Sequence, residues 1–351
     1  MKRKLMMLVA AIAVGTGAWA QDTPMVTLQN DTETKVFYGS DSFKDAMEVA
    51  NHGDVVTLSS GIFNAPVITK AVAIFGAGGN VANDTIDTGL TQINGDMYIQ
   101  IDSTATGFYL EGVFCNDNEV WVEKPLKSAS FVKCRFNSIN FNKNDSVHTM
   151  VNSEMVYFYQ CRIAGWLEPG ECNAMTVYNS VINNVGMNTE SSTIIFQNSL
   201  LFGVHYDLKN ARFENSYIYI LLTNSNGIWH PTTSTSSSNL SSTCSAFNSV
   251  ACDAYWDDMA VQTGCWKDMY FNFFVEGSYA KYSDTDSYEL NDSYKTTYIG
   301  TDGKPIGLYG GDYPYNTIPS VPYVVKKEIA TKSENGKLKV SIKVAVPGSN
   351  L

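Results

Sequence analysis

Apolar and polar positions recur with the same spacing in five short segments in the middle of the chain. In each segment the first and sixth positions are apolar, the third is Lys, Gln or Asn, and the fourth is small. The segments span residues 131–136, 158–163, 177–182, 196–201 and 213–218. Their fourth positions are separated by 27, 19, 19 and 17 residues, which suits the coils of a parallel β-solenoid with loops of variable length.

The phase of each segment predicts a bend at its third position. A continuous strand would place positions one, three and five on one face, whereas the apolar and small residues stand at one, four and six. Asn tolerates the left-handed backbone that such a bend requires. We therefore expect a stack of turn residues formed by Asn179, Asn198 and Asn215 and extended by Lys133 and Gln160. The fifth position, which includes Arg135 and Arg162, is predicted to face outward.

A β-sandwich with irregular strands is the alternative interpretation of this pattern. A sandwich gives no reason for the same residue class at the same offset in successive segments. We therefore predict an all-β fold built as a parallel solenoid.

A helix is predicted ahead of the repeats. Apolar residues at positions 43, 46, 47 and 50 have helical spacing, and Asp41 or Ser42 can cap the start. Strands are expected at 55–58 and 71–76. Because the first coil of a solenoid exposes apolar interior and unpaired backbone, we expect about 40–54 to cover that end.

These residues resemble the opening of right-handed parallel β-helix proteins of the pectin-lyase-like superfamily. The resemblance lies in the order helix, Gly-Asp, strand, Gly-x-aromatic, strand and Gly-x-Gly, at residues 42–46, 53–58, 61–63 and 74–78. Residues 288–290, 300–303, 306–311 and 319–322 resemble the closing segment of secreted bacterial β-helix proteins without an assigned activity. The resemblance implies a right-handed β-helix, in line with the general preference for right-handed crossovers. It does not imply one function, because the superfamily mixes lyases, hydrolases and adhesins.

The N-terminus predicts export. Residues 1–20 have a basic start, an apolar stretch and Ala18-Trp19-Ala20 before Gln21, which is typical of a signal peptide cleaved after Ala20. No later apolar run approaches the roughly 20 residues that span a bilayer. We expect a β-helix domain at 21–322 with a loop-rich segment at 223–322, and a tail at 323–351. The mature protein is expected in the periplasm, at the cell surface or outside the cell.

Charge narrows the range of partners. Without residues 1–20 the chain has 21 Lys and Arg against 35 Asp and Glu, a net charge of −14. Nucleic acid and anionic lipid need concentrated Lys and Arg, so neither is an expected partner. Polysaccharide remains the most plausible ligand, and the oligomeric state stays open.

Seven cysteines follow the predicted cleavage point, at positions 115, 134, 161, 172, 244, 252 and 265. Cys134 and Cys161 are expected to be buried neighbours, where Cys acts as a small apolar residue rather than in a disulfide. Cys244, Cys252 and Cys265 lie in one irregular segment that a disulfide could close. Their spacings of 8 and 13 match no zinc pattern, and no cofactor is expected.

Catalytic residues are weakly indicated. The inverting hydrolases of the superfamily use grouped aspartates, Gly-His-Gly and Arg-x-Lys, whereas none of the four histidines here stands between two glycines. The adjacent acids Asp257 and Asp258 are interpreted as a solvated loop pair. A lyase needs Ca²⁺ or Lys with Arg; only under this alternative would Ca²⁺ be involved.

The nearest group of lyase residues is Lys133, Arg135 and Arg162, with the arginines on coils about 4.8 Å apart. The alternative, which we favour, is a pair of exposed arginines neutralised by loop acids such as Glu154 or Glu168.

Residues 223–286 are predicted to leave the coil. Residues 232–242 are almost wholly Ser, Thr and Asn, and a dense aromatic set follows. We favour a C-terminal cap that packs over the last coil. The alternative is a sugar-binding platform that uses Trp229, Trp256 or Trp266, with Trp121 and Trp166, on predicted loops, as weaker candidates.

Residues 337–346 alternate Lys with apolar residues, which predicts a strand. This strand either closes the C-terminal edge of the solenoid, which we favour, or serves as a sorting or attachment element. Together these features predict an exported, non-catalytic binding or scaffold protein with glycan as its ligand. The alternative is a polysaccharide lyase or glycoside hydrolase that acts on acidic glycans.

Overall fold

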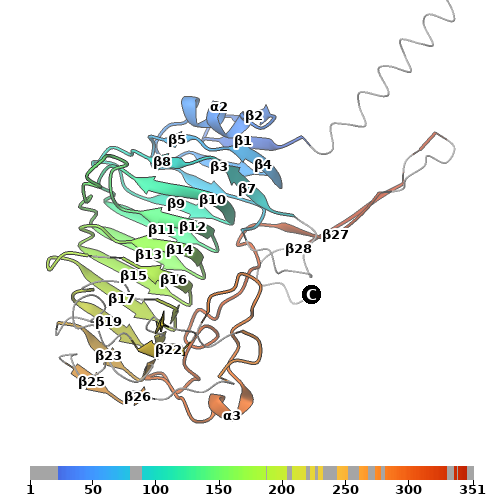
Figure 1. Ribbon diagram of the computed structural model, residues 1–351. Coiled ribbons are helices and arrows are strands. Elements are labelled where there is room, and N and C mark those ends of the chain that lie inside the picture. Colours follow the sequence, from blue (N-terminus) through green and yellow to red (C-terminus); the bar gives the residue numbers. More distant parts are fainter. Residues whose placement is uncertain are drawn as a thin grey trace, which may run out of the picture.

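Two long β-sheets dominate the protein (Figure 1). The computed structural model describes residues 23–79, 89–186, 188–203, 208–218, 222–225, 228–231, 243–251, 261–267, 273–277, 281–329, 336–337 and 339–345. The predicted signal peptide therefore lies outside the described residues, as does the acid pair Asp257-Asp258.

Within the described residues, each sheet has twelve strands. The first contains, in spatial order, β2 (Thr34–Tyr38), β1 (Met25–Gln29), β3 (Val55–Leu58), β6 (Ala73–Phe75), β9 (Phe108–Glu111), β11 (Ser128–Val132), β13 (Met155–Tyr159), β15 (Ala174–Tyr178), β17 (Thr193–Gln197), β19 (Ala211–Glu214), β23 (Ser245–Phe247) and β25 (Val261–Thr263). The second contains β26 (Trp266–Lys267), β24 (Val250–Ala251), β20 (Tyr217–Ile218), β18 (Leu200–Leu201), β16 (Val181–Val185), β14 (Arg162–Glu168), β12 (Arg135–Asn140), β10 (Val113–Val122), β7 (Thr91–Asn94) and β4 (Gly61–Asn64), with β5 (Val67–Ile68) and β8 (Met97–Ile99) beside them.

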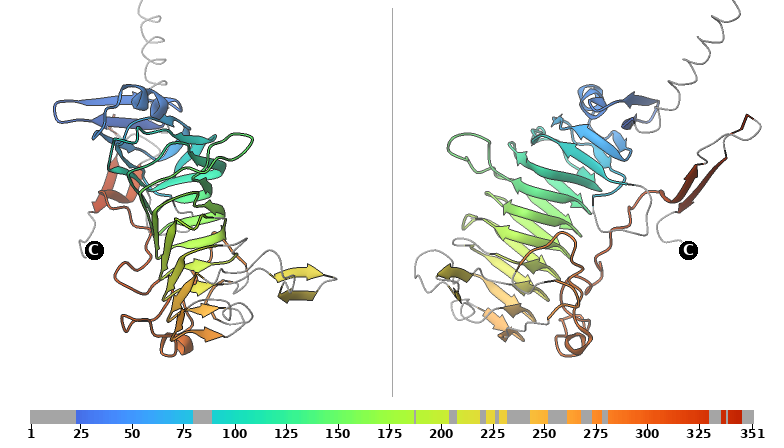
Figure 2. Two further views of the ribbon diagram at one scale, coloured as in Figure 1. Left: turned by 90° about the vertical axis from the view of Figure 1, so that its left-hand side faces the viewer. Right: turned by 45° about the vertical axis from the view of Figure 1, so that its right-hand side comes forward.

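The chain alternates between the two sheets, and we call one strand from each sheet, with its turn, a coil. From β3 and β4 onward, neighbouring strands pair in parallel, as β11 with β13 and β12 with β14 do. The coils stack along one axis in all three ribbon views (Figures 1 and 2). The predicted all-β fold is confirmed, and its long parallel sheets are compatible with a parallel β-helix.

The turn within each coil bends where the repeat predicted it. The backbone is left-handed at the third position of all five segments, with φ of 51° at Lys133, 55° at Gln160, 44° at Asn179, 52° at Asn198 and 51° at Asn215. The backbone N–H of each donates to the next coil, as in Asn179 N to Gln197 O at 3.0 Å. The ladder of hydrogen bonds therefore continues through the bend, and the predicted turn stack is confirmed.

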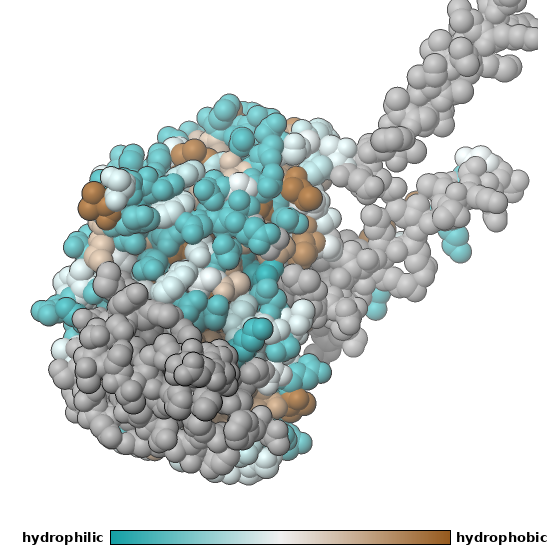
Figure 3. Space-filling view, viewed as in Figure 1, coloured by the Kyte–Doolittle hydropathy of each residue, from teal (hydrophilic) through white to brown (hydrophobic). Residues whose placement is uncertain are grey.

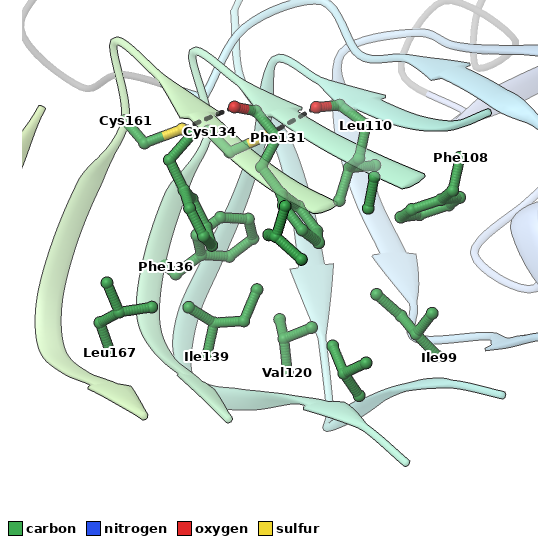
Figure 4. Close-up of a cluster of buried hydrophobic side chains, with 14 of the residues drawn as sticks. Ile99, Phe108, Leu110, Val120, Phe131, Cys134, Phe136, Ile139, Cys161 and Leu167 are labelled. Carbon is green, nitrogen blue, oxygen red and sulfur yellow. Dashed lines mark hydrogen bonds between the residues drawn. The ribbon is translucent and has the colours of Figure 1, made fainter. Parts of the chain in front are cut away.

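The interior is filled by the first, fourth and sixth positions of the repeat. Phe131 stacks on Phe158, with ring centroids 4.9 Å apart. The small fourth positions form a second column, in which Ser180 N donates to Ser199 Oγ at 3.2 Å. At earlier coils the column holds Cys134 and Cys161, whose thiols donate to backbone carbonyl oxygens (Figure 4).

The cysteines are unpaired wherever the structure describes them. Six are free thiols, and five of these are buried. Cys134 and Cys161 are thus buried neighbours without a disulfide, as predicted. Cys244 and Cys265 do not bridge to each other, and Cys252 lies outside the described residues.

The coils extend further than the sequence indicated. We expected residues 223–286 to leave the coil, but β23 to β26 add two more strands to each sheet. Phe247-Asn248-Ser249-Val250 repeats the earlier pattern, and Asn248 has φ of 43°. The expectation was wrong because the polar insertion before this segment hides its spacing from the preceding repeat.

One helix lies at the N-terminal end of the stack. α2 (Ser42–Val49) forms where helical spacing predicted it, and its buried residues include Phe43, Ala46 and Met47. It contacts β1, β2, β4 and β5. β1 pairs antiparallel with β3, so this pair departs from the parallel stack.

A long irregular segment runs back along the outside of the coils. We call residues 281–320 the C-terminal strap; it includes the short helix α3 (Asp292–Lys295). Figure 1 and the right panel of Figure 2 show it in orange and brown, beside the coils from the last ones toward the first. Much of the aromatic set that was expected to cap the last coil lies outside the described residues; its described members Phe273 and Phe274 pack against Tyr217.

The strap changes the environment of the fifth repeat position. Val181, Leu200 and Tyr217 face outward but form a second apolar cluster with Phe273, Tyr288 and other residues from 273–315. All three are at most 3 % exposed. The outward column is thus buried by the strap together with Phe273 and Phe274, rather than by the coil itself.

The C-terminal strand does not join the edge of either long sheet. β28 (Val340–Ala345) pairs antiparallel with β27 (Tyr323–Ile329), and the two form a separate sheet. Figure 2 shows this hairpin projecting away from the coils. The edge-closing expectation was wrong because β27, a partner close in sequence, is available to pair with it.

Two further strands, β21 (Leu222–Ser225) and β22 (Ile228–Pro231), also form a separate hairpin.

One face of the protein has a largely hydrophilic surface where its residues are described. Figure 3 shows one face, on which apolar residues are scattered among polar ones. Within the described ranges, no helix is long and apolar enough to span a membrane.

Candidate functional site

A pocket lies on the outer face of three neighbouring strands of the second sheet. Its volume is about 410 Å³, and it is lined by Glu119, Trp121, Ser138, Asn140, Asn142, Val147, His148, Met150, Trp166 and Glu168. We call it the outer-face pocket. The volume is within the range of small-molecule sites.

Strand irregularities place the lining residues. The pairing of β10 with β12 shifts register between Cys115 and Glu119, and that of β12 with β14 shifts between Phe136 and Ile139. Such bulges turn side chains to a new direction. After the shifts, Val120, Ile139 and Leu167 are fully buried in the interior, and the alternate residues face the pocket.

The alternate residues form two rows across the strands. In one row Glu119 pairs with Ser138, and Ser138 Oγ accepts from the backbone N–H of Trp166 at 3.0 Å. In the other row, Trp121 pairs with Asn140, which pairs with Glu168. Each row therefore brings an indole, a small polar residue and a carboxyl to the same surface, in opposite order.

A loop from β12 to β13 forms one wall. The His148 ring lies 5.7 Å from the Trp121 ring, measured between centroids. The carboxylate of Asp145 accepts hydrogen bonds from Val147 N and from Thr149 N and Oγ1. These bonds hold the loop in shape, and they lower the pKa of Asp145, led by the Thr149 backbone bond.

Three polar groups of the pocket lack a partner within the described part of the chain. Trp121 is 6 % exposed and its Nε1 donates to no acceptor; Asn142 is 9 % exposed and its Oδ1 accepts from no donor. The carboxyl of Glu168 also has no hydrogen-bond or ion-pair partner among these residues. Buried polar groups are nearly always paired, and only four described side-chain atoms break this rule. Two of these four atoms belong to residues of the pocket, and both are shielded from solvent.

The two carboxyls of the pocket are perturbed. Burial, with a smaller effect from the charge of Glu119, raises the pKa of Glu168 to about 7. Burial and Asp96 also raise the pKa of Glu119, against the opposing effects of Asn140 and His148. Glu119 accepts from Asn140 Nδ2 at 3.2 Å. The pocket thus holds one carboxyl that is near half-protonation at neutral pH.

Gly186 leaves the space that the Glu168 side chain occupies. A Cβ at residue 186 would overlap the Glu168 carboxyl, so this carboxyl lies directly over the glycine backbone. Glu168 was considered in the sequence as a partner for the arginines, but it belongs to this pocket instead.

The lyase candidates lie elsewhere, under the strap. Arg135 binds Asp284 through two hydrogen bonds, one of them from Nε at 2.7 Å, and its guanidinium lies 4.2 Å from the Phe114 ring centroid. Burial tends to raise the pKa of Asp284, but the bonds from Arg135 and Tyr282 outweigh it and lower that pKa. Lys133 Nζ donates to the backbone oxygen of Ile318 at 2.5 Å.

Arg162 is 3 % exposed and anchors the strap. It donates to the backbone oxygens of Ser283 and Asp284, each at 3.1 Å, and of Asp286 at 2.7 Å. Its Nε donates to Tyr315 Oη at 3.0 Å. Arg135 and Arg162 are paired in register, as predicted, but both are buried rather than exposed. The acidic partner of Arg135 is Asp284, whereas Arg162 binds backbone oxygens and a tyrosine hydroxyl.

The turn stack binds the same strap. Asn179 Nδ2 donates to Leu308 O at 2.9 Å and to Gly310 O at 2.8 Å. Further bonds join Gln160 to Pro314 O, Asn215 to Thr301 and Asn248 to Ile299 O. The turn residues therefore hold the C-terminal segment as well as the bend.

The three tryptophans proposed as a sugar platform are not brought together within the described residues. Trp256 lies outside them, and of Trp229 only the backbone, in β22, is described. Trp266 is half-buried with its ring edge-to-face against Tyr298, at 5.0 Å between centroids. The weaker candidates Trp121 and Trp166 lie on strands rather than loops and share the outer-face pocket.

A second aromatic group lies on the first sheet. The rings of Tyr159 and Tyr178 stack 4.9 Å apart, and Tyr313 of the strap packs edge-on against both. This contact makes the group part of the strap interface.

Metal binding finds no support in the described ranges, where no group of three or more His, Cys, Asp or Glu could hold an ion. No family model, curated protein or solved structure matches the chain.

Proposed function

We propose that this chain is an exported right-handed parallel β-helix protein of the pectin-lyase-like type that binds glycan in the outer-face pocket without cleaving it. The observation that carries the proposal is a pocket of about 410 Å³ whose lining combines the half-buried indole of Trp166 with the carboxyl of Glu168, which has no partner among the described residues. A ligand with hydroxyl groups can donate to that carboxyl while its apolar face packs on the indole.

The remaining lining groups suit a sugar. The half-buried indole of Trp166 supplies an apolar surface, against which the C–H face of a pyranose can pack, while Trp121 is only 6 % exposed. Asn140, Ser138 and Glu119 supply fixed polar groups beside them. A few polar groups on an apolar wall give a site its orientation and specificity.

The arginines also support a binding role rather than a lyase role. A lyase needs a cation that reaches the substrate carboxylate, but Arg135 and Arg162 are occupied by the strap. No Lys or Arg is among the residues that line the outer-face pocket.

The first test is a glycan-array screen of residues 21–351, followed by titration calorimetry with each glycan that binds. Trp166→Ala should weaken binding by about tenfold or more, a loss of about 1.4 kcal/mol. Trp266→Ala is the matched control, since Trp266 lies outside the pocket, and should bind as the unchanged protein does. Binding lost in the Trp266 variant and kept in the Trp166 variant would move the site to the C-terminal coils. If no glycan on the array binds, the proposal is rejected.

A glycoside hydrolase is the second candidate, and the raised pKa of Glu168, about 7, favours it. In that reaction protonated Glu168 would give its proton to the glycosidic oxygen as the C–O bond breaks. Glu119 would take a proton from the water that adds to the anomeric carbon. New reducing ends that disappear in Glu168→Gln would establish hydrolysis, whereas new unsaturated ends, seen by ultraviolet absorbance, would establish a lyase. Either result would overturn the non-catalytic role.

A further inference from the structure

The outer-face pocket is an acidic site without a cation. Glu119 and Glu168 line it, Asp96 Oδ1 accepts from Glu119 N at 3.0 Å, and the described lining contains no Lys or Arg. His148 is the one lining residue that can carry a positive charge, and its ring lies beside Trp121. A half-buried carboxylate without a partner is costly because burial removes water from a charge.

A bound metal ion does not fit this surface. No group of three or more metal-ligating side chains exists among the described residues, and two indole rings occupy the wall where further oxygen ligands would be needed. An organic cation fits better, because an ammonium group is attracted both to carboxylates and to the faces of tryptophan rings.

We propose that the outer-face pocket selects sugars that carry a free amino group, with the ammonium group on the Glu168 carboxylate. This inference rests on the proposed function and names its substrate class. The indole of Trp166 would pack on the ring face. Uronic acids are rejected, since their carboxylate would meet Glu119 and Glu168 at close range.

The direction of the pH dependence separates this ligand from a neutral sugar. An ammonium group needs ionised Glu168, whose pKa is raised to about 7, so its binding should strengthen as pH rises toward neutrality. A neutral sugar that accepts a hydrogen bond from protonated Glu168 should bind more weakly over the same range. The other ionisable groups that face this carboxyl are Glu119, with Asp96 behind it, and His148.

The experiment is titration calorimetry of residues 21–351 with three oligosaccharides of equal length: β-1,4-linked glucosamine, its fully N-acetylated form, and galacturonic acid. Acetylation removes the charge and keeps the sugar ring. At about pH 7 we expect the amino form to bind about tenfold or more tighter than the acetylated form, and galacturonic acid to show no binding. Lowering the pH to about 5.5 should reduce that preference.

Two variants test the assignment to Glu168. Glu168→Gln should remove the preference for the amino form and leave binding of the acetylated form in place. Glu154→Gln is the matched control, because Glu154 is an exposed glutamate outside the pocket, and should keep the preference. The circular dichroism of each variant reports whether it is folded.

Equal or tighter binding of the acetylated form would overturn this inference and leave the proposed glycan-binding function standing. Tighter binding of galacturonic acid would also overturn it. Absence of binding by all three sugars, together with a silent glycan array, would reject the proposed function as well.

Discussion

Replacing Asn179 tests how the turn stack holds the protein together. Its backbone has φ of 44°, it is 1 % exposed, and its Nδ2 donates to two carbonyl oxygens of the strap, Leu308 O and Gly310 O. One substitution therefore probes both the left-handed bend and the attachment of the strap.

Two variants separate these contributions. Asn179→Gly keeps the left-handed bend at low cost and removes only the side chain. Leu308 O keeps its hydrogen bond from Tyr315 N, but Gly310 O loses its side-chain donor, so we expect the free energy of unfolding to fall by about 1–3 kcal/mol. Asn179→Ala removes the same bonds and also places a Cβ in the left-handed region. That adds about 1–2 kcal/mol.

Asn198→Gly is the matched control. Asn198 occupies the same position one coil later, with φ of 52° and 1 % exposure, but its buried Nδ2 has no acceptor within the described residues. Removing an unpaired buried donor removes a penalty, so we expect a change of less than about 1 kcal/mol.

The assay is urea unfolding followed by intrinsic fluorescence, with the midpoints compared at equal slope. Midpoints that fall in the order Asn198→Gly, Asn179→Gly, Asn179→Ala support the reasoning. Equal midpoints for the two Asn179 variants would show that the left-handed backbone carries no cost. An unchanged midpoint in Asn179→Gly would refute the role of these bonds in holding the strap.

Three further predictions follow from buried groups. Arg162→Lys should destabilise the protein by about 2–4 kcal/mol in the same assay, because an ammonium group cannot reproduce the planar set of donors; an unchanged midpoint would contradict this. Because the pKa of Glu168 is raised to about 7 in the folded state, the folded protein binds a proton that the unfolded chain has lost, and stability should fall as pH rises from about 4.5 to about 7. In Glu168→Gln, the decrease in the free energy of unfolding between these two pH values should be smaller by about 1–2 kcal/mol. This is less than the whole pKa shift corresponds to, because water partly screens the carboxyl. Urea unfolding at both pH values measures the difference. Burial and the neighbouring Cys161 raise the pKa of Cys134 well above its usual value, so Cys134 should resist thiol reagents until urea unfolds the chain. Peptide mass spectrometry measures the labelling. Rapid labelling of Cys134 in the native protein would contradict its place in the buried column.

The sequence by itself determined the coil and its bend. Apolar, small and apolar residues at fixed offsets can be buried together only if the strand turns at the third position, and the positive φ at Lys133, Gln160 and the three asparagines follows from that local requirement. The fourth-position serines and cysteines likewise lie in one buried column. Local rules suffice here because each coil repeats the spacing of apolar and small residues of the previous one.

Tertiary structure alone decided which outward residues remain accessible. The fifth-position residues face away from the coil by the rule of alternation, but residues 273–315 bury them, and this irregular segment has no periodicity that predicts its path. Arg135 and Arg162 therefore became strap anchors, because Asp284 and the carbonyls near it lie more than a hundred residues away in sequence.

The outer-face pocket also could not be predicted from the sequence. Trp121 and Trp166 stand 45 residues apart, and each was expected on a loop. The register shifts in β10, β12 and β14 set which residues face outward on adjacent coils, and so bring Glu119 and Trp121 beside Trp166 and Glu168. A bulge shifts every later side chain by one position, and its place depends on packing between coils rather than on the residues of one strand.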